Sequence, residues 1–155
     1  MKKIILFMAI AAVGATACDE RPQPLTIDNA LTAEEVAAGR LTPEVMWKMS
    51  RAGSSSLSPD GTRLLYQQTD YNMAENRGAT TLWVEDLATK RATRLTDFAS
   101  NNHSPQWSAD GSAIYFLSDR SGSSQVWRMN ASGGEATQLT GSGDSEGIPD
   151  VEGFG

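Results

Sequence analysis

Short apolar runs alternate with polar turns along this chain, and one such arrangement occurs twice. In the first copy the turn Leu57-Ser58-Pro59-Asp60-Gly61 precedes the apolar run Leu64-Leu65-Tyr66. In the second copy, fifty residues later, Trp107-Ser108-Ala109-Asp110-Gly111 precedes Ile114-Tyr115-Phe116. Asp-Gly between apolar segments is typical of a β-hairpin, because glycine adopts a positive φ and the Asp carboxylate accepts nearby backbone N–H groups. We therefore predict two equivalent hairpins, with turns at Asp60-Gly61 and Asp110-Gly111.

The repeat continues downstream of the two hairpins, at a shorter offset. Leu82-Trp83-Val84 matches Val126-Trp127-Arg128, and Arg94-Leu95-Thr96 matches Gln138-Leu139-Thr140, each pair 44 residues apart. The change from 50 to 44 means that the first copy carries six extra residues, which we place within Asp70 to Ala79. A unit of 44 to 50 residues with four strand-like runs is typical of one blade of a β-propeller.

The pattern predicts an all-β fold class in which each copy forms four strands. The expected strands lie near residues 53–58, 63–68, 80–86 and 91–96, and again near 103–108, 112–118, 124–130 and 135–140. Up-and-down strand order places the loops 69–80 and 119–124 on the face opposite to the Asp-Gly turns. Loops of variable length on a rigid scaffold often carry binding contacts, so this face is the candidate working face.

The predicted blades are 53–96 and 103–140, and residues 151–155 resemble the start of a third. Phe154 stands where Leu57 and Trp107 stand in their own copies. Propellers need roughly 4–8 blades to close their ring. We therefore expect residues 41–155 to be the front part of a propeller that belongs to a longer protein.

Two short helices are expected before the first strand. Thr32 followed three residues later by Glu35 is a capping-box pattern, which predicts a helix that ends near Gly39. Thr42-Pro43-Glu44 predicts a second helix, with Thr42 as N-cap and Pro43 at the first helical position, running to about Ser50.

The first 17 residues have the pattern of a secretory signal peptide. Lys2-Lys3 is followed by an apolar run from Ile4 to Gly14 and by Ala15-Thr16-Ala17, a small-residue cleavage site. The apolar run is too short to span a bilayer as a helix. We expect an exported protein of the cell envelope, in the periplasm or on the outer membrane.

Cys18 follows the cleavage site and is the only cysteine of the chain. This arrangement resembles a bacterial lipobox, in which the cysteine is acylated, although Ala15 occupies the usual leucine position. We predict lipid attachment at Cys18, with residues 18–40 forming the anchor tether and the first short helix. The membrane would then be contacted by the acyl chains. The alternative is ordinary cleavage after Ala17, with no role for the thiol.

Net charge narrows the range of partners. The formal charge of the 155 residues is −6, and loss of Lys2 and Lys3 with the signal peptide would leave 11 basic and 19 acidic residues. A surface of that sign is poorly suited to nucleic acid. We therefore expect no nucleic-acid partner.

Two candidates for catalytic chemistry have structural explanations that fit better. Gly143-Asp144-Ser145-Glu146-Gly147 fits the G-x-S-x-G pattern, but a nucleophile elbow needs a strand before the serine and a helix after it. Gly141-Ser142 and Pro149 occupy those places, so a coincidence in a linker is favoured. His103 is the only histidine, and a loop hydrogen bond is favoured over catalysis or metal binding.

The acidic and aromatic residues likewise favour structural roles. Four carboxylates in the C-terminal loop lack a defined Ca²⁺ ligand spacing; they are Asp144, Glu146, Asp150 and Glu152. Trp83, Trp107 and Trp127 each lie inside a strand pattern, which favours packing between blades. We therefore expect no catalytic residue, no cofactor and no metal site in this chain.

These residues together resemble the beginning of a bacterial serine peptidase of the prolyl oligopeptidase family, in the dipeptidyl- and acylaminoacyl-peptidase branch. The segment Leu41 to Trp47, the turn at Asp60-Gly61 and Glu75-Asn76-Arg77-Gly78 resemble the start of that family's propeller. Segments from the second copy resemble a blade shared with TolB-like and WD-like propellers: Trp107 to Gly111, Phe116 to Arg120, Gly133-Gly134 and Leu139-Thr140.

The resemblance implies a propeller that caps an α/β-hydrolase domain and admits short peptides while excluding folded proteins. In that family the catalytic Ser, Asp and His lie in the hydrolase domain, C-terminal to the propeller, so none is carried over to residues 1–155. The expected function is the gating segment of a secreted serine exopeptidase, without peptidase activity of its own. The alternative is a non-catalytic TolB-like lipoprotein whose propeller binds proteins or the cell wall.

Overall fold

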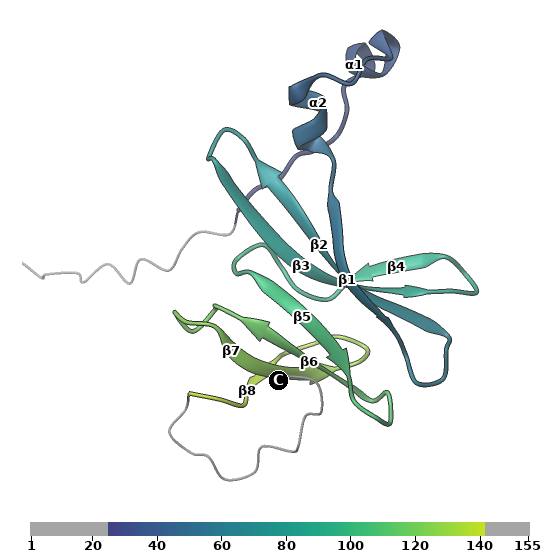
Figure 1. Cartoon of the computed structure of the whole chain (residues 1–155), viewed down its shortest axis with the longest axis vertical. Helices are drawn as coiled ribbons and strands as arrows, with labels where there is room; N and C mark the ends of the chain where they lie inside the picture. The colour runs from purple at the N-terminus through teal and green to yellow at the C-terminus, as the bar shows by residue number, and fades with distance from the viewer. Residues whose placement is uncertain (1–24, 142–155) are drawn as a thin grey trace, which may run out of the picture.

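A computed structural model describes residues 25–141, which form two four-stranded antiparallel sheets preceded by two short helices (Figure 1). The first sheet contains, in order, β1 (Arg51–Leu57), β2 (Arg63–Asn72), β3 (Arg77–Asp86) and β4 (Arg91–Arg94). The second contains β5 (Asn102–Trp107), β6 (Ala113–Ser118), β7 (Gln125–Asn130) and β8 (Thr137–Gln138). Each strand pairs with its neighbours in sequence, as in a propeller blade. The predicted all-β fold class is confirmed.

The two helices follow from their capping residues. Helix α1 (Ala33–Ala38) begins at the Thr32 capping box, where the Thr32 hydroxyl accepts the Glu35 N–H and the Glu35 carboxylate accepts the Thr32 N–H. It ends at Gly39, whose φ of 58° lies in the left-handed region. Helix α2 (Pro43–Lys48) has Thr42 as its N-cap and ends two residues before the expected end.

The register shows that the two copies are structurally equivalent up to one point. Ser118 pairs with Gln125 in the last rung of β6 and β7, and the equivalent rung of the first copy pairs Gln68 with Thr81. In the second copy, residues 119–124 connect that rung. In the first copy, residues 69–80 do so and account for the six extra residues.

Residues 69–80 are not the loop that the sequence predicted. They continue the β2–β3 hairpin through four further rungs, from Thr69 paired with Thr80 to Asn72 paired with Arg77, and only residues 73–76 form the turn. We call residues 69–80 the hairpin extension. The sequence indicated its position but not its conformation.

The core lies between the two sheets, where β5 packs against β1, β2 and β3. Seven buried residues form it: Leu65, Leu82, Val84, Ile114, Phe116, Met129 and Ala131. The first three come from the first sheet and the others from the second or the residue after it. Trp107 and Trp127 are partly buried against this core, so two of the three tryptophans pack between blades as expected. Trp83 instead stacks on Tyr66 with ring centroids 6.4 Å apart.

Arg63 links the two sheets near the Asp-Gly turns. Its Cζ lies 4.7 Å from the centroid of the Trp107 ring, and its Nη2 donates to the Gly111 carbonyl. Trp107 in turn donates from Nε1 to the Ser56 carbonyl of β1. These contacts join the turn of the second sheet to the first strands of the first sheet.

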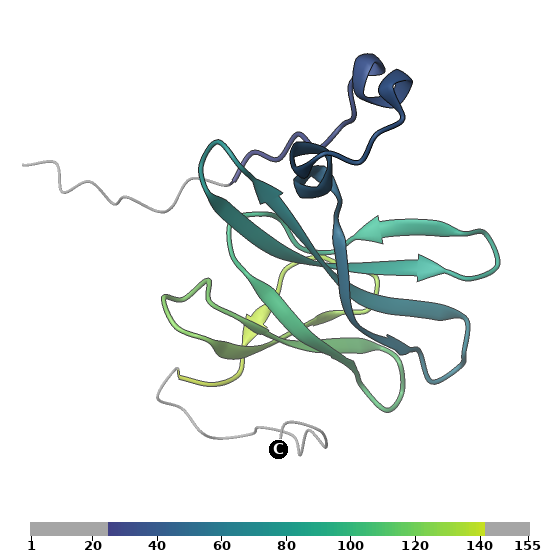
Figure 2. The same ribbon diagram turned by 45° about the horizontal axis from the view of Figure 1, so that its top comes forward.

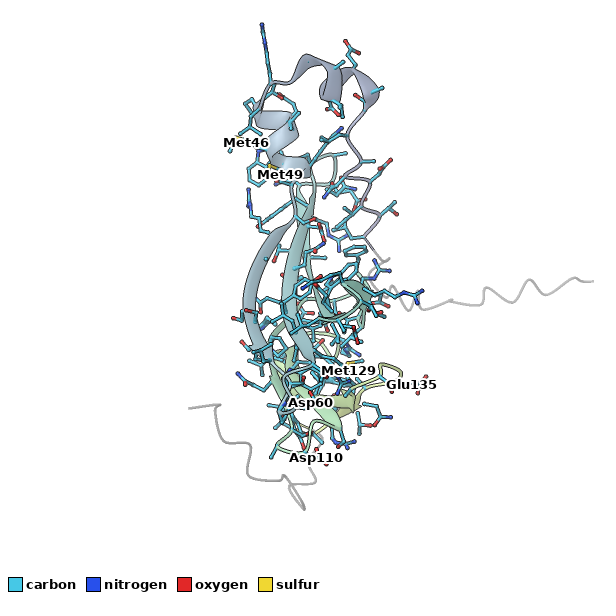
Figure 3. All side chains as sticks on the ribbon, turned by 90° about the vertical axis from the view of Figure 1, so that its right-hand side faces the viewer. Met46, Met49, Asp60, Asp110, Met129 and Glu135 are labelled. Carbon is cyan, nitrogen blue, oxygen red and sulfur yellow. The ribbon has the colours of Figure 1, made fainter. Side chains whose placement is uncertain are left out.

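The two ends of the molecule differ in character. Figure 3 shows Asp60 and Asp110, which belong to the two Asp-Gly turns, toward one end, whereas Met46 of α2 and its C-cap residue Met49 lie toward the opposite end. The hairpin extension lies beside α2, as Figure 1 and Figure 2 both show. The expected separation of turns and variable loops onto opposite faces is therefore observed.

Candidate functional site

The Asp-Gly turns form the same hydrogen-bond network in both copies. Asp60 Oδ1 accepts from the Ser58 hydroxyl at 2.6 Å and from the Thr62 N–H and hydroxyl at 3.1 and 2.9 Å. Gly61 has a φ of 70°, which favours glycine. In the second copy Asp110 accepts from Ser108 and Ser112, and Gly111 has a φ of 68°. Each carboxylate holds a turn closed.

These hydrogen bonds predict an acid-sensitive contribution to stability. They lower the pKa of Asp60 to about 2, with the Ser58 hydroxyl as the largest cause, and the pKa of Asp110 to about 2 in the same way through Ser108. A carboxyl group whose pKa is depressed in the folded state stabilises the fold fully above its unfolded pKa, near 4, and less as the pH falls toward 2. We expect ¹³C NMR titration of both carboxyl groups to show midpoints at about 2.

A matched variant separates these turns from the other acidic residues. Asp60→Asn should reduce the loss of stability between about pH 4 and pH 2, while Glu34→Gln, on an exposed part of α1, should leave it unchanged. Midpoints near 4 for both aspartates would show that the hydrogen bonds do not persist in solution.

His103 lies at the start of β5, and its Nδ1 is 3.2 Å from the Ser104 hydroxyl oxygen. Within residues 25–141, no group of three or more His, Cys, Asp or Glu side chains is arranged to hold a metal ion. Cys18, the G-x-S-x-G segment, the four carboxylates of the C-terminal loop and the beginning of a third blade all lie outside the described residues. The same is true of the predicted signal peptide.

The candidate functional site is formed where three parts of the chain meet. They are residues 25–30, which we call the N-terminal segment, helix α2 and the hairpin extension. Tyr71 packs edge-to-face against Trp47, with ring centroids 5.3 Å apart. The Arg51 guanidinium carbon lies 4.7 Å from the Trp47 centroid and 4.6 Å from the Tyr71 centroid. Such cation–π contacts hold rings and guanidinium in place. Here they hold α2 against the hairpin extension, with the Trp47 side of the helix in contact with Tyr71.

Hydrogen bonds attach the N-terminal segment to the same place. Asn72 Nδ2 donates to the Thr26 carbonyl at 2.7 Å and to the Glu75 carboxylate at 3.1 Å. Lys48 of α2 donates from Nζ to the Ala30 carbonyl at 3.3 Å. Three segments that are distant in sequence are thus held together without a disulfide.

Between these segments lies a cavity of about 540 Å³, which we call the lead-in cavity. Its apolar lining comes from Pro43, Trp47, Tyr71, Met73 and Ala74. Its polar lining comes from Thr26, Asp28, Asn29, Glu44, Lys48 and Asn72. A mostly apolar cavity of this size with a few polar groups is typical of a ligand site.

A second hollow, the inter-sheet groove, lies between the hairpin extension and the loop that follows β6. It encloses about 440 Å³ and is lined by residues 77–79, 98–101, 119, 120 and 122. Arg120 is one of its lining residues, and it donates from Nη2 to Asn102 Oδ1 at 2.8 Å and from Nε to the Ser118 hydroxyl at 3.0 Å. Its guanidinium also lies 4.8 Å from the Trp127 ring centroid. Burial lowers the pKa of Arg120, and the carboxylates of Asp97 and Asp119 oppose this effect by raising it.

The sequence placed residues 69–80 on the face opposite to the Asp-Gly turns but missed the residues that build the cavity there. Asp28 carried no signal in the sequence, because it lines the cavity only when folding brings it beside α2 and the hairpin extension. Arg51 carried none either, because its contact with Tyr71 joins residues 20 positions apart. The available signals were Trp47 in the segment before the first strand and Tyr71 within the six extra residues. Neither indicated that the two rings meet.

Comparison with known proteins gives one family match over most of the chain. Residues 34–153 match the PD40 family, described as the TolB beta propeller domain. Dipeptidyl-peptidase 5 of Porphyromonas gingivalis is 33% identical over 125 residues, covering 81% of this chain and 17% of that protein. An uncharacterized peptidase of Bacillus subtilis is 33% identical over 84 residues, covering 54% of this chain and 13% of that protein.

The fold also matches a solved peptidase structure. The acylaminoacyl peptidase of Pyrococcus horikoshii superposes with a TM-score of 0.51 at 20% identity, over 61% of this chain and 14% of the other. At that identity the likeness concerns the fold. This chain spans less than a fifth of the length of each of these three proteins.

In residues 25–141 no helix has the length and apolar character to cross a membrane.

Proposed function

The chain belongs to the PD40 family of TolB-type β-propeller domains, and from this premise we propose that it is the substrate-gating propeller segment of a serine exopeptidase that acts on short peptides. The match to dipeptidyl-peptidase 5, 33% over 125 residues, carries the proposal. In this proposal the propeller narrows the path to a separate hydrolase domain. The propeller itself carries out no chemical step.

The face opposite to the Asp-Gly turns has features that support a role in binding other molecules and not in structure alone. Two cavities of about 540 and 440 Å³ lie on it, and it carries the hairpin extension, the one segment that lengthens the first copy relative to the second. The opposite face carries the closed Asp-Gly turns. A gate needs cavities and variable segments, such as those beside the hairpin extension, at the place where peptides pass.

The test is to ask whether the native protein carries a reactive serine. Antibody raised against residues 25–141 would capture the protein from the source cells, and a fluorophosphonate probe would label an activated serine. We expect a labelled species larger than the 16.6 kDa of this chain, with hydrolysis that falls steeply as peptide length increases. Captured protein that takes no label would reject the peptidase proposal.

The family match itself favours one alternative. PD40 is described through the TolB propeller, so a non-catalytic propeller that binds proteins or the cell wall fits the same fold. Captured protein that takes no fluorophosphonate label and copurifies stably with an envelope protein or with cell-wall fragments would favour it.

We further propose that the protein is exported to the cell envelope and anchored through lipid on Cys18. Lys2-Lys3, the apolar run to Gly14 and the position of Cys18 support this. Two or more acyl chains hold a protein stably at a membrane, whereas loss of the acylated cysteine removes that affinity. Cys18→Ser is therefore expected to move the protein from the membrane fraction to the soluble fraction.

The matched control for that experiment is Ser50→Cys or another variant that leaves Cys18 in place. It should remain in the membrane fraction, and growth with an alkyne-labelled fatty acid should label it but not the Cys18→Ser protein. Membrane retention of Cys18→Ser at the level of the parent protein would exclude the lipid anchor.

A further inference from the structure

The lead-in cavity carries an excess of negative charge. Its lining includes two carboxylates, Asp28 and Glu44, and one ammonium group, Lys48. The Lys48 Nζ lies 2.8 Å from the Glu35 carboxylate, so its charge is already balanced. Glu44 is held in its ionised form, because hydrogen bonds from its own N–H and from Thr42 lower its pKa. The lining therefore contains two carboxylates, and its one cation is already paired with Glu35.

The apolar part of the lining is unusually exposed. Trp47 is 36% exposed and Met73 is 54% exposed, although large apolar side chains normally gain free energy by burial. Both belong to the cavity, and both would be covered by a molecule placed between α2 and the hairpin extension. The rings of Trp47 and Tyr71 already attract the guanidinium of Arg51, which itself lies outside the lining.

From these observations we propose that the lead-in cavity is a binding site for a ligand with an apolar, preferably aromatic, body and one positive charge. The body packs on Trp47, Tyr71 and Met73, and the charge is directed at Asp28 and Glu44. An anionic ligand of the same shape would be repelled by these carboxylates. The site does not depend on the proposed peptidase, because all its groups belong to residues 25–141.

The test uses three molecules that share an indole ring and differ in charge. Tryptamine is cationic, tryptophol is neutral and indole-3-propionate is anionic, and their binding to the purified chain can be followed by ¹H–¹⁵N NMR through the Trp47 indole signal. We expect tryptamine to bind about fivefold more tightly than tryptophol, and indole-3-propionate to bind most weakly.

Charge and shape are then separated by substitution. Asp28→Asn together with Glu44→Gln should remove the preference for tryptamine over tryptophol, while Glu34→Gln, outside the lining, should keep it. Met73→Ala should weaken all three ligands to a similar degree, and Met46→Ala, exposed on α2 but outside the lining, should weaken none.

Equal affinity for the three ligands would overturn the proposal, as would tightest binding of the anion. So would an unchanged preference in the Asp28→Asn, Glu44→Gln double variant, provided that its NMR spectrum shows the parent fold. Absence of binding by all three up to their solubility limits would show that the cavity is not a ligand site of this class.

Discussion

Replacement of Phe116 by alanine is expected to destabilise the protein by about 3–5 kcal/mol, the usual cost of removing a large buried aromatic side chain. Phe116 is 0% exposed and lies in β6, in the core between the two sheets. The Arg120 guanidinium lies 5.4 Å from its ring centroid, so the ring also supports the inter-sheet groove. Single domains have a total stability of about 5–15 kcal/mol, and the loss is therefore a large part of it. Urea denaturation followed by tryptophan fluorescence measures it.

Two control variants make this result specific. Leu57→Ala removes a side chain that is 58% exposed and should change the free energy of unfolding by well under about 1 kcal/mol. Phe116→Leu keeps most of the apolar volume and should fall between the two. A cost for Phe116→Ala no larger than that for Leu57→Ala would mean that the sheets do not pack in solution as described.

Replacement of Asn102 by alanine is expected to cost about 2–3 kcal/mol, because it removes a buried side chain that makes three hydrogen bonds and leaves its partly buried partners without it. Asn102 is 0% exposed at the start of β5. Its Nδ2 donates to the carbonyls of Ser100 at 2.9 Å and Thr80 at 3.3 Å, and its Oδ1 accepts from Arg120. The same side chain thus connects the second sheet to β3 of the first. The free energy of unfolding in urea is again the measurement.

A double-mutant cycle identifies the part of this cost that involves Arg120. The double variant Asn102→Ala, Arg120→Ala should be more stable than the sum of the single changes predicts, with a coupling of at least about 0.5 kcal/mol. Asn130→Ala, at an exposed position of β7, is the control and should have little effect. Strict additivity of the Asn102 and Arg120 changes would show that the two side chains do not interact in solution.

The repeat explains why most of the fold could be predicted from the sequence. Landmarks such as Asp60-Gly61 and Asp110-Gly111 recur at fixed offsets, and each marks a hairpin whose strands are also apolar. All eight strands and both helices were anticipated, with ends that shift by a few residues.

The hairpin extension could not be predicted because its strands lack the alternation that signals a half-buried strand. From Gln67 to Asn72 the sequence contains one apolar residue, Tyr71. Those strands are held instead by pairing with residues 77–80 and by α2. The lead-in cavity was hidden for the same reason, since tertiary contacts bring its three segments together. Lipid attachment at Cys18 and export remain predictions.

The hairpin extension also affects how the molecule opens. The last residue of β2 that pairs with β1 is Thr69, and the strand partners of β4 in β3 begin only at Trp83. Beyond Thr69 the extension is therefore a ribbon of two strands, which is marginally stable without further support. Its amide hydrogens should exchange with solvent through local opening of the ribbon, at rates independent of the unfolding of the sheets. The register directs the Asn72 amide at Arg77 across the ribbon, so its exchange rate would report this opening beside the contact between Trp47 and Tyr71, and would slow whenever the lead-in cavity is filled.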